Sequence, residues 1–166
     1  MRGAALGLLL LALASCSKAP PAPAPPTTAS GELERAAIAA GVIPDPNDTD
    51  ITGLYARDTD RVCVVPDRDG YRIGAFVDYG DAQTCSAKGK VTRAGEKLSI
   101  EFEGGCRLDA SFDGTSIAFP GEVPAPCRAL CGGHASLAAL EAERLSDSVS
   151  EASTLRDAKS RMLCGG

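Results

Sequence analysis

The chain has 166 residues, a formal net charge of −5, seven cysteines, one histidine and no tryptophan. That length accommodates one compact domain with tails and excludes a second independent core. The 17 basic side chains are outnumbered by 22 acidic ones and form no basic stripe with interleaved aromatics, which excludes a nucleic-acid-binding protein. An acidic domain instead attracts basic partners such as cationic proteins or divalent ions, although the same charge also serves solubility.

The N-terminal segment has the pattern of an export signal. Arg2 precedes an apolar run over residues 4–14. This run is too short to cross a bilayer as a permanent helix but suits the apolar region of a secretory signal. We therefore predict that residues 1–15 are a signal peptide.

A cysteine follows this run directly. Leu13, Ala14, Ser15 and Cys16 resemble the lipobox of bacterial lipoproteins. The resemblance implies that Cys16 becomes the first residue of the mature chain, with a diacylglyceryl thioether and an acylated amine, and several acyl chains on one residue give a stable membrane anchor. Ser17 resembles an outer-membrane sorting residue, so we expect a cell-envelope protein on the periplasmic face of the outer membrane. An ordinary signal peptide that leaves Cys16 as a stray thiol is the alternative.

Residues 16–30 are rich in proline and alanine, which predicts an extended, poorly ordered tether after the lipidated cysteine. At about 3.1 Å per residue of polyproline geometry, the tether reaches roughly 40 Å. Residues 31–166 are expected to form a single periplasmic domain. A short helix is predicted over residues 32–40, with Gly41 as its stop.

Beyond a breaker cluster at residues 44–50, the apolar pattern changes to a period of two, which is typical of strands. Turn signals such as Asp69-Gly70 and Asp113-Gly114 separate the runs, and such short connections make neighbouring strands antiparallel. The sequence therefore predicts a β-meander over residues 51–119 with one apolar face. The expected strands cover residues 51–57, 61–65, 71–79, 83–92, 97–103, 106–112 and 115–119.

The C-terminal segment, residues 134–164, consists largely of strong helix formers whose apolar residues recur at helical spacing. Ser148 and Glu151 are spaced as a capping box, which would divide the segment into two helices. We expect this segment to cover the apolar face of the sheet. The predicted fold class is α+β: an antiparallel β-meander or small barrel of six to seven strands, disulfide-stabilised and covered by a C-terminal helix.

Cysteine parity agrees with export. Once Cys16 is assigned to the lipid, an even set is left, as a disulfide framework in an oxidising compartment requires. The sequence does not give the pairing, but a bond from Cys127 or Cys131 to Cys164 would clamp the C-terminal helix against the sheet. The disulfide candidates are Cys63, Cys85, Cys106, Cys127, Cys131 and Cys164.

No recognisable catalytic constellation is present in the sequence. The one histidine, His134, is best explained as part of the entry turn of the C-terminal helix. A cysteine nucleophile would need a thiolate beside a base, and Cys127 or Cys131 near His134 is the one such combination. Both thiols are more economically assigned to disulfides, so we predict that the protein is not an enzyme.

One stretch resembles the first half of a calcium loop. Asp48, Asp50, Thr52 and Gly53 have the spacing of such a loop, but its twelfth position is Thr59 where a bidentate glutamate belongs. A solvated acidic loop explains the same residues. We predict no metal and no cofactor.

Two hypotheses of function are open. The first is a non-catalytic binding module, lipid-anchored in the periplasm. Its layout resembles that of the membrane-bound lysozyme inhibitors of bacteria, lipoproteins with a small disulfide-stabilised β-barrel; the resemblance carries over no binding residues, and residues 67–70 or 78–82 would be loop contacts for a cationic enzyme. The second is a structural or assembly-scaffold lipoprotein that docks an envelope protein on a helix over residues 135–163. In both, the partners are the membrane, through the anchor, and an envelope protein.

Overall fold

The computed structural model describes residues 29–43, 45 and 49–165. The predicted signal peptide, Cys16 and almost all of the tether lie outside the described residues. The strands are β1 (Gly53–Arg57), β2 (Asp60–Asp67), β3 (Gly70–Asp78), β4 (Thr84–Ala94), β5 (Lys97–Phe102), β6 (Cys106–Phe112), β7 (Ser116–Ala118) and β8 (Glu141–Ser146). The helices are α1 (Ala29–Ala39), the 3-10 turn η1 (Glu103–Gly105), α2 (Ala125–Arg128) and α3 (Val149–Ser153).

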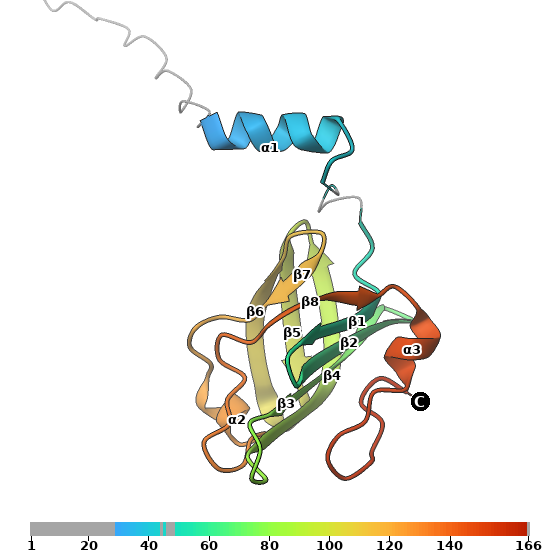
Figure 1. The fold of residues 1–166 in the computed structure, drawn as a ribbon. Helices are drawn as coiled ribbons and strands as arrows, with labels where there is room; N and C mark the ends of the chain where they lie inside the picture. The colour runs from blue at the N-terminus through green and yellow to red at the C-terminus, as the bar shows by residue number, and fades with distance from the viewer. Residues whose placement is uncertain (1–28, 44, 46–48, 166) are drawn as a thin grey trace, which may run out of the picture.

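The eight strands form a closed antiparallel barrel in which each strand pairs with its neighbours in the chain and β8 returns to pair with β1 (Figure 1). The predicted meander is confirmed, and its curling into a barrel is shown, with eight strands where six to seven were expected. The predicted N-terminal helix is present as α1, which starts three residues earlier than expected and contains no buried residue.

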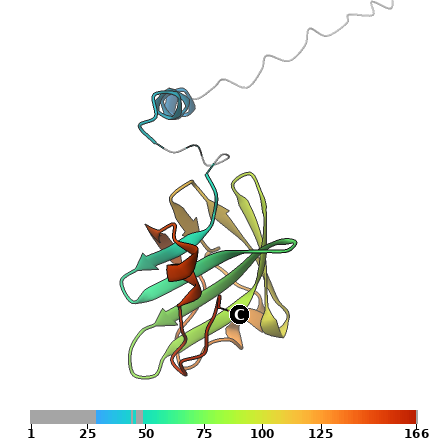
Figure 2. The same ribbon diagram turned by 90° about the vertical axis from the view of Figure 1, so that its right-hand side faces the viewer.

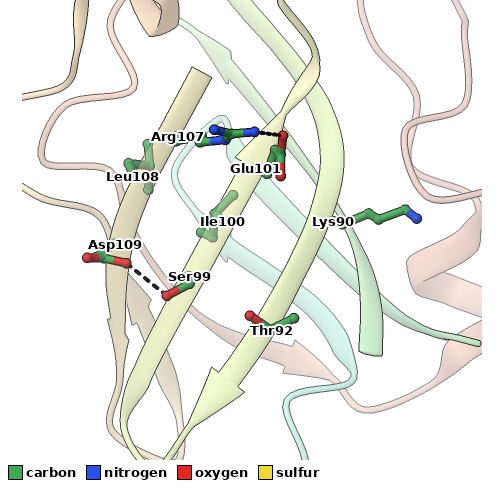
Figure 3. A pocket seen from close by; sticks show the side chains of 8 residues that line it. All are labelled: Lys90, Thr92, Ser99, Ile100, Glu101, Arg107, Leu108 and Asp109. Atoms are coloured by element: carbon green, nitrogen blue, oxygen red, sulfur yellow. Dashed lines mark hydrogen bonds and ion pairs between the residues drawn. The ribbon is translucent and has the colours of Figure 1, made fainter. Parts of the chain in front are cut away.

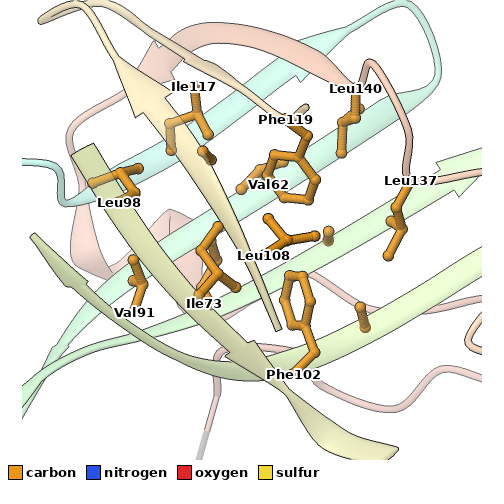
Figure 4. Packing of buried hydrophobic residues seen from close by; sticks show 14 of the residues in the cluster. Val62, Ile73, Val91, Leu98, Phe102, Leu108, Ile117, Phe119, Leu137 and Leu140 are labelled. Atoms are coloured by element: carbon orange, nitrogen blue, oxygen red, sulfur yellow. The ribbon is translucent and has the colours of Figure 1, made fainter. Parts of the chain in front are cut away.

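Strict alternation of side chains fills the barrel. In β5 and β6 every second residue is buried and those between are exposed. Because a strand presents successive side chains to opposite faces, these apolar residues all point inward. Figure 4 shows them meeting in one cluster, so the interior is a packed core. The labelled members are Val62, Ile73, Val91, Leu98, Phe102, Leu108, Ile117, Phe119, Leu137 and Leu140.

The prediction of a long C-terminal helix over residues 134–164 is wrong. Residues 134–140 are a loop, residues 141–146 form β8, and α3 is five residues long. Strand β8 hydrogen-bonds to both β7 and β1, so it removes the two free edges that a seven-stranded sheet would expose. This tertiary gain outweighs the helix propensity of the sequence EAERL, which is a weak preference.

One feature of the C-terminal prediction is nevertheless present. Ser148 is the N-cap of α3, and its side chain accepts a hydrogen bond from the Glu151 backbone N–H at 3.3 Å. The segment was expected to cover the apolar face of the sheet, but the barrel encloses that face, and α3 and the chain after it lie over the outer side of β1 and β2 (Figure 2). This contact forms a second apolar cluster made of Cys63, Val65, Ala152, Leu163 and Cys164.

All six predicted disulfide candidates are bonded, as Cys63–Cys164, Cys85–Cys131 and Cys106–Cys127. The expected clamp from Cys127 or Cys131 to Cys164 is wrong. Cys85 and Cys106 lie at the starts of β4 and β6, at the end of the barrel that residues 119–140 close. They therefore form disulfides with the two cysteines of that segment, Cys131 and Cys127. Cys164 instead fastens the C-terminal segment to β2 on the outer face.

None of the helices in the described part of the chain has the length and apolar character needed to cross a membrane.

Candidate binding face

The sequence-predicted site residues are spread over the molecule. The loop at residues 67–70 joins β2 to β3, and the loop at residues 78–82 joins β3 to β4. They lie at opposite ends of β3, which is roughly 27 Å long at the usual rise per residue. The two loops therefore do not form one contact surface. Cys16 lies outside the described residues.

His134 lies in the loop between α2 and β8, where its backbone N–H donates to Gln83 Oε1 at 3.2 Å. It is exposed and does not enter a helix, because the helix predicted there does not form. Cys127 and Cys131 are each bonded to a strand cysteine. In this oxidised form neither sulfur is a thiolate for His134 to activate.

The acidic stretch that resembles a calcium loop has another role. Asp50 accepts hydrogen bonds from the Thr52 N–H at 2.6 Å and from the Tyr71 hydroxyl at 2.9 Å. Burial raises the pKa of Asp50, but these hydrogen bonds and the charge of Arg144 outweigh burial and hold the pKa below 3.8. Asp48 is outside the described residues, and among residues 29–43, 45 and 49–165 no three potential metal ligands gather.

Two arginines hold residues 49–52, the segment that leads into β1, against the end of the barrel. Arg144 donates to the carbonyls of Thr52 and Asp50, at 2.7 and 2.5 Å, and lies 5.1 Å from the centre of the Tyr55 ring. Arg93 donates to the Thr49 carbonyl. Both guanidinium groups hold backbone carbonyls and lie over aromatic rings, although the shielded Nη2 of Arg93 has no acceptor among the described residues. This end is therefore closed by the chain itself.

The outer face of β4, β5 and β6 is different. Its polar side chains are exposed, and the C-terminal segment approaches it at Lys88 and Glu103, which line a small cavity together with Arg161 and Met162. A shallow hollow of about 440 Å³ lies on this face. Figure 3 shows the residues that line it; the side chains of Ile100 and Leu108 belong to the barrel core, so the exposed side chains around the hollow are polar. We name this surface the β4–β6 face; its polar side chains are Lys88, Lys90, Thr92, Lys97, Ser99, Glu101, Glu103, Arg107 and Asp109.

Most charges of the β4–β6 face are paired across strands. Arg107 contacts Glu101 at 2.5 Å, and this carboxylate raises the pKa of the guanidinium. Lys97 contacts Asp109 at 2.9 Å, and the ammonium, together with the Ser99 hydroxyl, lowers the pKa of that carboxyl. Exposed pairs of this kind contribute little to folding, about 0 to 1 kcal/mol each. They are free to exchange partners when another surface approaches.

A second hollow of about 580 Å³ continues from this face toward the C-terminal segment. Lys90 and Glu101 line both hollows. The second one also includes Arg72 of β3 and Lys88 of β4, and its far wall is formed by Met162, Leu163 and Gly165. The β4–β6 face thus ends at a recess whose side chains are mainly charged.

Comparisons with known proteins give no further guidance, since no family model, no curated protein and no solved structure matches this chain.

The β4–β6 face is not predicted from the sequence as a site, although part of its pattern is visible there. Alternation in residues 106–112 already placed Arg107 and Asp109 opposite the apolar side. What the sequence did not reveal was the register that sets Lys90 beside Glu101, and Glu101 beside Arg107. That register depends on the turns at both ends of β5.

Proposed function

We propose that this chain is a non-catalytic binding module, lipid-anchored at the periplasmic side of the cell envelope, and that it holds an envelope protein on its β4–β6 face. The anchor is proposed from the resemblance of Leu13 to Cys16 to a lipobox. Three disulfides suit an exported domain, because such bonds persist in oxidising compartments. The proline-rich tether would present the barrel away from the lipid surface.

One observation carries the choice of face: two adjacent hollows, of about 440 and 580 Å³, share the exposed side chains of Lys90 and Glu101 on the outer surface of the sheet. Both barrel ends are occupied by the chain, and the outer face of β1 and β2 is covered by the C-terminal segment. The exposed, exchangeable ion pairs of this face resemble the polar rim of transient protein interfaces.

The proposal is tested by photo-crosslinking in the native envelope. A photo-reactive amino acid replaces Thr92, which is exposed on the β4–β6 face. In a matched variant it replaces Glu122, which is exposed in the segment of residues 119–140 that closes one end of the barrel. We expect a discrete protein adduct from position 92 alone. The adduct should be lost in the Cys16→Ser chain, which lacks the anchor.

Two results would contradict the proposal. Absence of an adduct at position 92 would remove the β4–β6 face as a binding surface, and equal adducts at positions 92 and 122 would show contact without a specific face. Recovery of integral envelope machinery, bound equally through every exposed surface, would favour the scaffold alternative. A scaffold that docks its partner on a helix over residues 135–163 is not supported, because these residues form β8 and the short helix α3 and no long helix.

A further inference from the structure

The recess at the edge of the β4–β6 face has an unusual arrangement of charge. Arg72 on β3 and Lys90 on β4 are direct register partners, and both side chains point outward. Like charges directly opposite each other on neighbouring strands destabilise a sheet. Both side chains line the hollow of about 580 Å³. The sheet therefore carries two facing cations beside an open space.

Of the described residues, three carboxylates line the recess, those of Asp67, Glu101 and Glu103, but none of them forms an ion pair with Arg72 or Lys90. Glu101, the register partner of Lys90 on β5, is held by Arg107, and Glu103 lies 3.3 Å from Lys88. Within the described residues, Arg72 and Lys90 form no ion pair and no side-chain hydrogen bond. The Nε–H of Arg72 is shielded from solvent and also has no acceptor. A shielded donor without an acceptor is rare in folded proteins.

The recess as a whole is balanced, with Arg72, Lys88 and Lys90 against Asp67, Glu101 and Glu103. The positive charge is concentrated along one row of register partners. From β3 to β6 this row is Arg72, Lys90, Glu101 and Arg107, three cations to one anion, in a chain whose net charge is −5. Solubility does not call for such a row, since the excess of carboxylates already supplies repulsion between copies. An anion placed between Arg72 and Lys90 would relieve this repulsion.

We propose that Arg72 and Lys90 bind a carboxylate of an acidic segment of the protein partner. This inference rests on the proposed function, because it assigns the chemistry of the same face. A guanidinium presents parallel N–H donors that match the two oxygens of a carboxylate, and Lys90 adds a second charge from the neighbouring strand. The recess is of the size of small ligand sites, so it admits a few side chains at once.

The test measures binding of a hexaglutamate peptide to the full lipidated chain in neutral phosphatidylcholine vesicles, at low and at physiological salt. Arg72→Gln should weaken binding by about tenfold or more, because a charge-assisted bidentate contact is lost. Lys90→Gln should weaken it by roughly three- to tenfold, because a point charge is lost. The control is Lys97→Gln, an exposed lysine of the same face with the same change of charge, which should stay within about twofold.

Each other outcome overturns the proposal. If Lys97→Gln weakens binding as much as Lys90→Gln, the peptide responds to general charge. If inorganic phosphate binds through Arg72 and the peptide does not, the ligand is a phosphate and the acidic-segment assignment is wrong. If neither binds, the recess is not an anion site. Thermal unfolding of the three variants, which alter exposed or half-exposed side chains, checks that each is folded.

The crosslinking experiment separates this inference from the proposed function. An adduct at position 92 that persists undiminished in the Arg72→Gln chain would leave the binding face standing and remove the anion site. Peptide binding that depends on Arg72, in a chain that gives no adduct at position 92, would leave the anion site standing and remove the protein-binding function.

Discussion

Replacement of both Cys63 and Cys164 by alanine should destabilise the domain substantially. This bond joins residues 101 apart in sequence, but the other two disulfides already shorten the path between them. The remaining path runs from Cys63 to Cys85 and then from Cys131 to Cys164, about 55 residues, for which the chain-entropy model gives about 4 kcal/mol. A loss of this size lowers Tm by roughly 15 °C for a domain of this length.

The assay is urea unfolding followed by circular dichroism, with native-state hydrogen exchange as a local readout. We expect a lower midpoint together with fast exchange of the Leu163 N–H, which donates to the Leu155 carbonyl at 3.0 Å in the C-terminal segment. A loss below about 1 kcal/mol, with Leu163 still protected, would refute the reasoning. It would mean that packing of the second apolar cluster alone keeps this segment on β2 and that the covalent constraint adds little.

Three further outcomes are expected. Gly74→Ala would place a Cβ 2.5 Å from the Leu163 Cβ and 2.9 Å from the Cys63 sulfur, so it should cost about 1 to 3 kcal/mol in urea unfolding, whereas Gly121→Ala, with open space around it, should be nearly neutral. Burial raises the pKa of Asp157, but hydrogen bonds from Arg161 and Lys159 outweigh burial and hold the pKa below 3.8. The ionised Asp157 therefore stabilises the fold at pH values above the unfolded-state pKa, and this stabilisation is lost as pH falls through the lower folded-state pKa. Asp157→Asn should remove this contribution, so the free energy of unfolding should fall less steeply as the solution is acidified. Ser148→Ala should cost about 1 kcal/mol by removing the N-cap of α3, as measured by thermal unfolding.

The strands could be predicted from the sequence because each carries its own signal. In β6 the apolar residues Leu108, Ala110 and Phe112 alternate with Arg107 and other polar residues over seven positions, and glycine-containing turns mark the ends. A period of two needs no knowledge of the partner strand. The same local reasoning identified Ser148 as a helix start, since a cap is a property of four consecutive residues.

Strand β8 could not be predicted in this way. Its residues Ala142, Arg144 and Leu145 belong to a run of helix formers. They are extended because the edges of β1 and β7 offer unpaired backbone groups with which β8 forms hydrogen bonds. Those edges exist only after the first seven strands have curled. Barrel closure is thus a cooperative property of the whole sheet, and no window of local sequence contains it.

The disulfide connectivity escaped prediction for a related reason. Cysteines pair according to which strand ends meet, and this depends on the direction of each strand around the barrel. Cys85 and Cys106 begin alternate strands, β4 and β6, and therefore lie at the same end, within reach of the segment that carries Cys127 and Cys131. The long helix expected at the C-terminus had placed Cys164 near that segment, so one wrong element also led to one wrong bond.

Exposure alone does not mark the β4–β6 face as functional, because a closed barrel buries its apolar side chains inside and needs no cover outside. The distinguishing feature is the register partnership of Arg72 and Lys90. Arg72→Glu would place a carboxylate directly opposite Lys90 and add a cross-strand ion pair of the kind that Lys97 forms with Asp109, because the other register partner of Arg72 is the apolar Val65. Arg72→Glu should therefore raise the free energy of unfolding slightly, by about 0.2 to 1 kcal/mol, while it abolishes binding of the acidic peptide. A variant that gains stability and loses binding would be hard to explain if the two cations served the fold. An Arg72→Glu chain that is less stable than the wild type would instead assign them a structural role.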